Sequence, residues 1–261
     1  MTDSMSLPPA MSQRAREFTG PPAPARPAAT VVLLRPRDDS FEVYVLRRAG
    51  TMTFGGVYAF PGGVVDPSDR PSTVRADWPE RLGLPGDEAH AVVGAAAREL
   101  FEETGILLAG PAAEPDRTVG AVDGADWESD RAAVQRRELG MADLLARRGL
   151  RLRDDLLLPW ARWITPEFEP RRFDTWFFVA LLPQAQSARD VSGEADRTAW
   201  VPIGGTDGLP MLPPTRRTLA QIAACGTLAD VVAASAHRDA ATPLNPRVVV
   251  TADGQVTLQI P

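Results

Sequence analysis

Apolar runs separated by turn residues predict a chain that mixes strands and helices. Residues 30–35 (TVVLLR) and 41–46 (FEVYVL) flank a charged turn and predict a β-hairpin. Residues 246–251 and 255–260, joined by an Ala-Asp-Gly turn, predict a second hairpin near the C-terminus. Further apolar runs are typical of strands and cover residues 106–109, 156–164, 172–182 and 198–203.

Helical spacing of apolar residues marks several other segments. The stretch 90–106 can place its small apolar residues against a core, and residues 127–148 show the same period. A break near Gly140 leaves both one helix and two helices open for the second stretch. Residues 215–224 and 228–237 predict two shorter helices beyond a Pro-Pro pair.

Residues 1–28 differ in composition from the rest of the chain. They contain six prolines among Ser, Ala and Arg, and they lack the apolar core of a signal peptide. We expect them to form a disordered or extended arm ahead of the folded region 29–261. Residues 64–89 are rich in Pro, Asp and Arg and predict an irregular excursion that can include one short helix.

Composition and charge exclude several classes of function. The chain is 44% hydrophobic and 24% charged, which is typical of a globular protein. Its net charge of −6 argues against nucleic acid as the main partner, and no apolar run is long enough to span a membrane. The complete absence of lysine excludes a P-loop lysine and a Schiff-base lysine.

A single cysteine, Cys225, excludes an intramolecular disulfide and fits a reducing compartment. We therefore expect a cytoplasmic protein. The neighbours of Cys225 are apolar, which favours a buried structural thiol over a nucleophile.

Three carboxylates are the main candidate for chemistry. Glu99, Glu102 and Glu103 stand at helical spacings i, i+3 and i+4, so they share one face of the predicted helix. Like charges at this spacing repel, and a bound cation would remove that cost. Oxygen ligands favour Mg²⁺ or Mn²⁺. The alternative is a solvated acidic surface at a helix that ends at Gly105.

Two neighbouring features favour the metal interpretation over a solvated surface. Arg98 adjoins the acidic residues and can orient a carboxylate. The loop Phe60-Pro61-Gly62-Gly63 lies upstream, and its glycines let the backbone approach a ligand closely.

Together these residues resemble the Nudix box, G-x5-E-x7-R-E-U-x-E-E-x-G-U with U an aliphatic residue. The second half of the box is matched at every defined position from Arg98 to Ile106. With seven residues between them, the box position before Arg98 falls on His90, where the family has a Glu that supports the loop. Gly63 and His90 are separated by 26 residues instead of five, which predicts an insertion of 21 residues.

The resemblance extends beyond the box to a long Nudix subgroup that includes mammalian peroxisomal coenzyme A diphosphatases. It covers roughly residues 29–238. An upstream coenzyme A signature is matched in part, since Met52 stands where a second Arg is expected. The residues that carry the wider likeness are 162–166, 171–175, 177–180, 212–215, Arg47 and Gly56.

The resemblance implies an α+β fold in which an α/β/α sandwich surrounds a mixed sheet. It implies a single domain over residues 29–261, with an insertion at 64–89 and a C-terminal extension of helices and a hairpin from about residue 206. The implied activity is metal-dependent hydrolysis of a nucleoside diphosphate linked to another moiety. The substrate would be coenzyme A or a related nucleotide sugar or dinucleotide. Mg²⁺ or Mn²⁺ would be held by Glu99, Glu102 and Glu103, aided by the Gly62 carbonyl.

Several further residues are candidates for the same site. Guanidinium groups match phosphate oxygens. The substrate-binding candidates are therefore Arg47, Arg48, Arg171 and Arg172, together with Gly62 and Gly63. For Arg47 and Arg48 the alternative is ordinary surface charge. Glu194 is a candidate general base, and its alternative is a surface Glu in a polar loop. The insertion either borders the substrate pocket or only enlarges the surface.

A second class of function stays open, namely a nucleotide-binding regulator with the same fold and no turnover. Such regulators often lose box carboxylates, and all three are present here, which favours an enzyme. The expected partner is a small nucleoside diphosphate derivative, and a homodimer is compatible with the sequence. His90 and His237 are the only histidines, so a histidine-based nucleophilic mechanism is not expected.

Overall fold

A mixed eight-stranded sheet forms the centre of the computed structural model, which describes residues 3–7, 9–50, 55–191, 193, 195–251 and 255–260. Strands β2 and β9 pair in parallel, whereas β2 pairs antiparallel with β3 and β9 antiparallel with β8. The order across the sheet is β10 (Ala195–Pro202), β3 (Ser40–Arg48), β2 (Ala25–Arg37), β9 (Arg172–Leu181), β8 (Leu158–Ile164) and β11 (Pro243–Leu244), with β4 (Tyr58–Ala59) on β3 and β5 (Gly62–Val64) on β2.

Strand β2 is buried without alternation from Ala28 to Leu34. A continuous apolar run is expected where both faces of a sheet are covered. Val31 and Leu33 pack into the core beneath α3 (Gly86–Thr104), whereas Val32 and Leu34 pack into the core beneath the helices of the C-terminal region. Alternate side chains of β2 therefore pack into the hydrophobic cores on the two opposite faces of the sheet.

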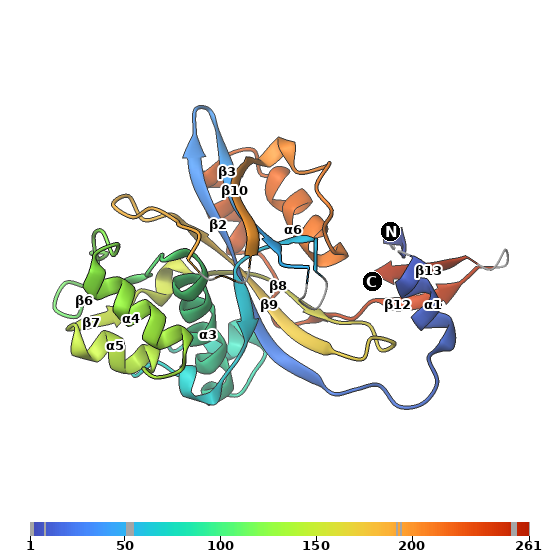
Figure 1. Ribbon diagram of the computed structural model, residues 1–261, viewed down its shortest axis with the longest axis horizontal. Coiled ribbons are helices and arrows are strands. Elements are labelled where there is room, and N and C mark those ends of the chain that lie inside the picture. Colours follow the sequence, from blue (N-terminus) through green and yellow to red (C-terminus); the bar gives the residue numbers. More distant parts are fainter. Residues whose placement is uncertain are drawn as a thin grey trace.

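Helices cover both faces of this sheet, as Figure 1 shows. Helices α3, α4 (Ala125–Gln135) and α5 (Met141–Arg147) lie on one side, and α6 (Pro213–Ala223) and α7 (Leu228–Ser235) pack on the other. The expected α/β/α sandwich around a mixed sheet is confirmed. The segment 127–148 forms two helices, because the chain breaks at Gly140, where the backbone is extended.

The N-terminal segment differs from the disordered or extended arm expected for residues 1–28. Strand β1 (Asp3–Ser6) pairs with β13 (Val256–Ile260), which in turn pairs with β12 (Arg247–Val250). Helix α1 (Pro9–Glu17) follows and packs on this small sheet, and both chain ends meet there in Figure 1. Local sequence could not reveal this, because the stabilising partner lies at the other end of the chain.

The insertion after the Pro-Gly-Gly loop packs into the core. The segment predicted as the insertion, residues 64–89, contains the 3₁₀ turn η1 (Pro67–Asp69) and the short helix α2 (Trp78–Leu82). Trp78 is fully buried and its indole N–H donates to Asp154, while the Leu82 carbonyl accepts from Trp176. This segment is therefore anchored in the core and does more than enlarge the surface, and of its residues only Val64 is among the described residues that line the cavity beside α3.

The remaining elements are short. They include the two-stranded pair of β6 (Ala109–Pro111) with β7 (Leu150–Leu152), and the 3₁₀ turns η2 (Asp154–Leu156) and η3 (Ile203–Gly205). Cys225 is half-buried, less enclosed than expected. In the described part of the chain, no single helix is long and apolar enough to cross a membrane; α6 and α7 meet that criterion only as a pair bent by 113°.

Candidate active site

The carboxylates of Glu99, Glu102 and Glu103 lie together on the last turns of α3, where each residue is at most 7% exposed. The helix ends directly after them, because Gly105 adopts a left-handed backbone with φ of 73° and its N–H bonds to the Phe101 carbonyl. The face predicted from the i, i+3, i+4 spacing is therefore present, and it is buried rather than solvated.

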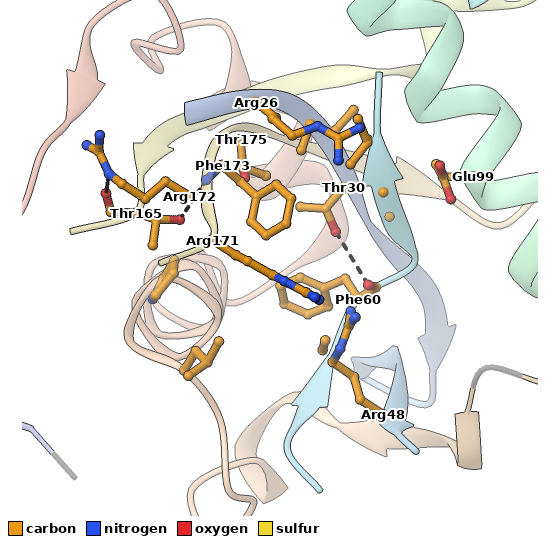
Figure 2. Close-up of a pocket in the computed structure, with 18 of the residues that line it drawn as sticks. Arg26, Thr30, Arg48, Phe60, Glu99, Thr165, Arg171, Arg172, Phe173 and Thr175 are labelled. Atoms are coloured by element: carbon orange, nitrogen blue, oxygen red, sulfur yellow. Dashed lines mark hydrogen bonds between the residues drawn. The ribbon is translucent and has the colours of Figure 1, made fainter. Parts of the chain in front are cut away.

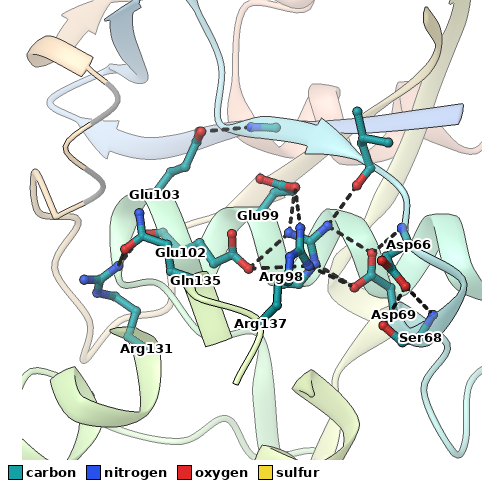
Figure 3. Close-up of polar contacts among 12 residues, drawn as sticks. Asp66, Ser68, Asp69, Arg98, Glu99, Glu102, Glu103, Arg131, Gln135 and Arg137 are labelled. Carbon is teal, nitrogen blue, oxygen red and sulfur yellow. Dashed lines mark hydrogen bonds and ion pairs between the residues drawn. The ribbon is translucent and has the colours of Figure 1, made fainter. Parts of the chain in front are cut away.

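Arg98 is fully buried beneath these carboxylates and uses all five of its N–H groups, as Figure 3 shows. Nη1 donates to Glu99 and Glu102 at 2.6 and 3.1 Å, and Nη2 donates to the Val64 carbonyl at 3.0 Å. Nε and Nη2 both donate to Asp69, at 2.6 and 2.9 Å. With no donor left for substrate, Arg98 acts as a positioning residue.

Asp69 corrects the expectation for the first half of the box. It lies six positions after Gly63, with five residues between them, which is the box spacing for the acid assigned above to His90. His90 instead lies half-buried in the second turn of α3. The inserted residues therefore lie between Asp69 and Arg98, not between Gly63 and the acid. The box spacing counted back from Arg98 falls within the inserted stretch, which is why it points to His90 instead of Asp69. Counting forward from Gly63 would have found Asp69.

Two local features hold Asp69 against the helix. Asp66 and Asp69 form a capping box around η1, in which the Asp66 N–H donates to Asp69 at 2.9 Å. Hydrogen bonds from Ser68 lower the pKa of Asp66 below its usual value. On the opposite side, a Cβ on Gly94 would collide with the Asp69 carbonyl. Glycine at this position lets the turn lie directly on α3, one helical turn before Arg98.

The Pro-Gly-Gly loop reaches the carboxylates from the sheet side. Gly62 pairs with Thr30 and Gly63 with Ala29 in the β2–β5 ladder. The Gly62 N–H donates to the Glu103 carboxylate at 3.0 Å, and a Cβ on Gly63 would collide with the Glu99 carboxylate. The close backbone approach expected from the two glycines is thus present, and it links the loop to the helix.

The balance of charge at this site favours an additional cation. Burial raises the pKa of Glu99 to about 7, and the nearby Glu102 adds to the rise while Arg98 opposes it. Burial also raises the pKa of Glu102. Arg98 carries one positive charge against several buried carboxylates, and hard oxygen donors are the ligands that Mg²⁺ and Mn²⁺ prefer. The donor chemistry therefore fits such an ion.

The present side-chain positions do not yet form a cation cage. Within the described residues, no three His, Cys, Asp or Glu side chains converge closely enough to hold a metal ion. Glu99 and Glu102 instead face two arginines, Arg98 and Arg137. Arg137 was not expected from the sequence, because it lies in the turn that follows α4 and is remote from the box helix α3 along the chain.

A cavity of about 990 Å³ opens beside the carboxylates. Glu99, Glu102 and the two glycines line it on the α3 side. Figure 2 shows Arg26 and Arg171 directed into it from the sheet, near Phe60 and Phe173, with Glu99 on the far side of β5. Its volume is in the range of small-molecule sites. Cationic and aromatic groups thus face an acidic wall across one cavity.

The structure separates the other substrate-binding candidates. Arg48 and Arg171 line the cavity, whereas Arg47 is absent from its described lining and lies 3.8 Å from Asp196. Arg172 also borders the cavity, but its guanidinium donates to the backbone carbonyls of residues 165 and 23, which fixes strand β9. Glu194 lies outside the described residues, so its role as a base stays a prediction.

A family model described as NUDIX domain matches residues 24–221, which is most of the 261-residue chain. The chain belongs to the Nudix family. A crystal structure of a Nudix hydrolase from Alicyclobacillus acidocaldarius is similar to this Nudix protein at 29% identity, with a TM-score of 0.61, over 81% of this chain and 96% of that one. This Nudix protein is therefore a hydrolase, and the enzyme class expected from the box is confirmed.

Two other Nudix structures are more distant. RenU, a Nudix hydrolase from M. Smegmatis, matches at 15% identity and a TM-score of 0.40 over 76% of this chain and 84% of its own. The NUDIX domain of Shewanella oneidensis NrtR, complexed with ADP ribose, matches at 12% identity with a TM-score of 0.44, over 84% of this chain and 98% of that one. Neither likeness bears on the substrate of this Nudix hydrolase. Hydrolysis of nucleoside diphosphates linked to another moiety follows in general from the family.

Proposed function

We propose that this Nudix hydrolase uses Mg²⁺ or Mn²⁺ to cleave the diphosphate of a coenzyme A-like nucleotide. The observation that carries the proposal is the buried carboxylate face of α3, which borders a cavity whose opposite side is lined by arginine and aromatic side chains. An acidic wall suits a metal-bridged diphosphate, and a cationic wall suits further phosphates on the same molecule.

Glu99, Glu102 and Glu103 would hold the metal, with the Gly62 carbonyl as a further candidate ligand. A bound divalent ion would stabilise charge on the phosphate oxygens and lower the pKa of a water. Arg98 keeps two of the three carboxylates at the cavity edge, and the Gly62 N–H fixes the third. Because these contacts exist before substrate arrives, the chain does not have to reorganise its backbone to present the carboxylates.

The substrate would lie with its diphosphate against the Gly62-Gly63 loop. Phe60 and Phe173 line the cavity and can stack on a base, while Arg26, Arg48 and Arg171 can bind phosphate outside the scissile linkage. Coenzyme A carries a phosphate of that kind on its ribose, which is why we place it first among the candidates. Nucleotide sugars and dinucleotides are the next class to test.

The proposal is tested by product analysis on a panel of substrates. Coenzyme A, ADP-ribose, NADH and a dinucleoside polyphosphate are incubated with Mg²⁺ or Mn²⁺, and with EDTA as the metal-free control. We expect cleavage of a diphosphate linkage that depends on the metal, and poor cleavage of a simple phosphomonoester. Equal rates with monoesters and diphosphates, or turnover unaffected by EDTA, would contradict the proposal.

A nucleotide-binding regulator is the alternative, and the same panel separates the two. A regulator would bind a nucleotide measurably and release no product with either metal. We also propose a cytoplasmic location, supported by the single, half-buried cysteine, which is compatible with a reducing compartment.

A further inference from the structure

Arg137 occupies an unusual backbone position directly after α4. Its φ of 61° lies in the left-handed region. Among the described residues other than glycine, Asp38 is the other one with a positive φ. A side chain with a Cβ adopts this conformation at a cost in free energy, and such costs concentrate at functional sites. The backbone at Arg137 is therefore a candidate functional position.

The Arg137 guanidinium faces three carboxylate oxygens at once. It lies 3.6 Å from Asp69 Oδ1, 3.8 Å from Glu102 Oε1 and 3.9 Å from Glu99 Oε1. These distances are longer than hydrogen bonds, so the attraction is electrostatic and lacks a fixed geometry. The side chain is also 47% exposed. Arg137 is thus attracted to these carboxylates by charge, at distances beyond hydrogen-bond range, and about half of its side chain is exposed to solvent.

Arg98 binds the same three oxygens in a different way. Its contacts to Asp69, Glu99 and Glu102 are true hydrogen bonds of 2.6 to 3.1 Å, and its side chain is 2% exposed. One arginine is therefore built into the core, while the other, Arg137, covers the outer side of the same oxygens. Figure 3 shows both guanidinium groups beside the carboxylates.

The position of Arg137 is set by the attachment of α4 to α3. Arg131 is buried in α4, and its guanidinium donates to the Glu102 backbone carbonyl at 2.8 Å and to Glu128 at 2.6 Å. Helix α4 ends about one turn later at Gln135, and both Gln135 and Arg137 line the cavity. The guanidinium consequently lies beside the Glu99 and Glu102 carboxylates on the wall of the same cavity.

We propose that Arg137 is an exchangeable counter-ion: it neutralises the carboxylates in the metal-free enzyme and turns to the substrate's diphosphate when a divalent cation takes its place. This inference rests on the proposed function. A cation near Glu99 and Glu102 would repel the guanidinium, and an anionic substrate in the cavity would attract it. The planar fork of arginine matches two phosphate oxygens, so the second position is as favourable chemically as the first.

Competition of this kind is measurable without turnover. Calorimetric titration with Mn²⁺ alone is performed on wild type, on Arg137→Ala and on Arg137→Lys. We expect Arg137→Ala to bind Mn²⁺ roughly three- to tenfold more tightly, because the competing charge is gone, and Arg137→Lys to stay near wild type. A second titration with ADP at saturating Mn²⁺ should show the opposite order, with Arg137→Ala binding about tenfold more weakly.

Arg136→Ala is the matched control, since it removes the same charge one residue away. Its guanidinium pairs with Glu138 at 2.7 Å on the exposed surface, not with the carboxylates. If Arg137→Ala and Arg136→Ala give the same Mn²⁺ affinity, or the same ADP affinity, the inference is wrong. Because neither titration requires hydrolysis, an enzyme that shows the expected affinities but cleaves nothing would refute the proposed function and leave this inference standing.

Discussion

Asp69 and Arg98 form a two-point ion pair across 29 positions of the chain, with Asp69 oxygens 2.6 and 2.9 Å from Nε and Nη2. The long insertion lies between the two residues, so it interrupts the box without separating the groups that pair. Both side chains are at most 3% exposed. The pair therefore joins the Pro-Gly-Gly loop region to α3 in a place where water cannot replace either partner.

Asp69→Asn should lower the free energy of unfolding by on the order of 3 kcal/mol. Removing one partner of a buried ion pair leaves the other charge uncompensated, although Glu99 and Glu102 still offset part of the Arg98 charge. Chemical denaturation measures the change. The matched control is Asp87→Asn, because the Arg70–Asp87 pair has the same chemistry with side chains 50% and 81% exposed, and its loss should cost less than about 1 kcal/mol. Equal effects would show that the buried pair is not structural.

Glu103→Gln should lower turnover by orders of magnitude while leaving the fold intact. Its amide could still accept the Gly62 N–H bond, but it cannot supply the negative charge that a divalent ion requires. Steady-state rates at saturating Mg²⁺ and a thermal melt are the measurements. Glu88→Gln, an exposed change in the first turn of the same helix, is the control and should leave the rate unchanged. An unaltered rate in Glu103→Gln would remove Glu103 from the metal site.

Local patterns predicted the elements of the fold where packing follows sequence period. The hairpin of β2 and β3, the break at Gly140 and the helices α6 and α7 were found from apolar spacing and turn residues. The N-terminal segment was missed for a physical reason. Strand β1 and helix α1 are stabilised by β13, and contacts between opposite chain ends leave no periodic signal in either segment.

The site was predictable to the same extent. The i, i+3, i+4 carboxylates and the paired glycines are set by the geometry of one helix and one strand, so spacing was enough. Asp69 was not predicted, because the inserted residues between it and Arg98 replace the normal box spacing. Arg137 could not be found at all, since only the docking of α4 through Arg131 brings it to the carboxylates.

Gly63→Ala should weaken Mn²⁺ binding, because its new Cβ would collide with the Glu99 carboxylate and force that side chain away. Overpacking of this kind costs about 1–3 kcal/mol, so a lower melting temperature should accompany it. Gly120→Ala is the control, since a Cβ there meets no atom within 4 Å. Mn²⁺ titration and a thermal melt are the measurements. Wild-type metal affinity in Gly63→Ala would mean that Glu99 tolerates displacement or is not a ligand.

Substitutions of the neighbouring residues Arg171 and Arg172 should have different effects, the first on substrate recognition and the second on stability. Arg172 donates to the carbonyls of Thr165 and Ala23 at 2.9 and 2.7 Å. Arg172→Ala should therefore lower stability by about 1–3 kcal/mol and reduce rates on coenzyme A and on its 3′-dephosphorylated form equally. Arg171 lines the cavity instead. Arg171→Ala should lower kcat/KM for coenzyme A about ten- to a hundredfold, the loss of one charged hydrogen bond.

The decisive quantity is the ratio of kcat/KM for coenzyme A to that for the 3′-dephosphorylated form. The dephosphorylated form lacks the phosphate that Arg171 would bind, so Arg171→Ala should change its rate little and bring the ratio close to one. Arg172→Ala, assayed well below its melting temperature, should keep the wild-type ratio because its contacts are to backbone carbonyls. If wild type itself shows no preference, the cavity arginines do not read a 3′-phosphate. Coenzyme A then loses its place ahead of nucleotide sugars and dinucleotides as the substrate.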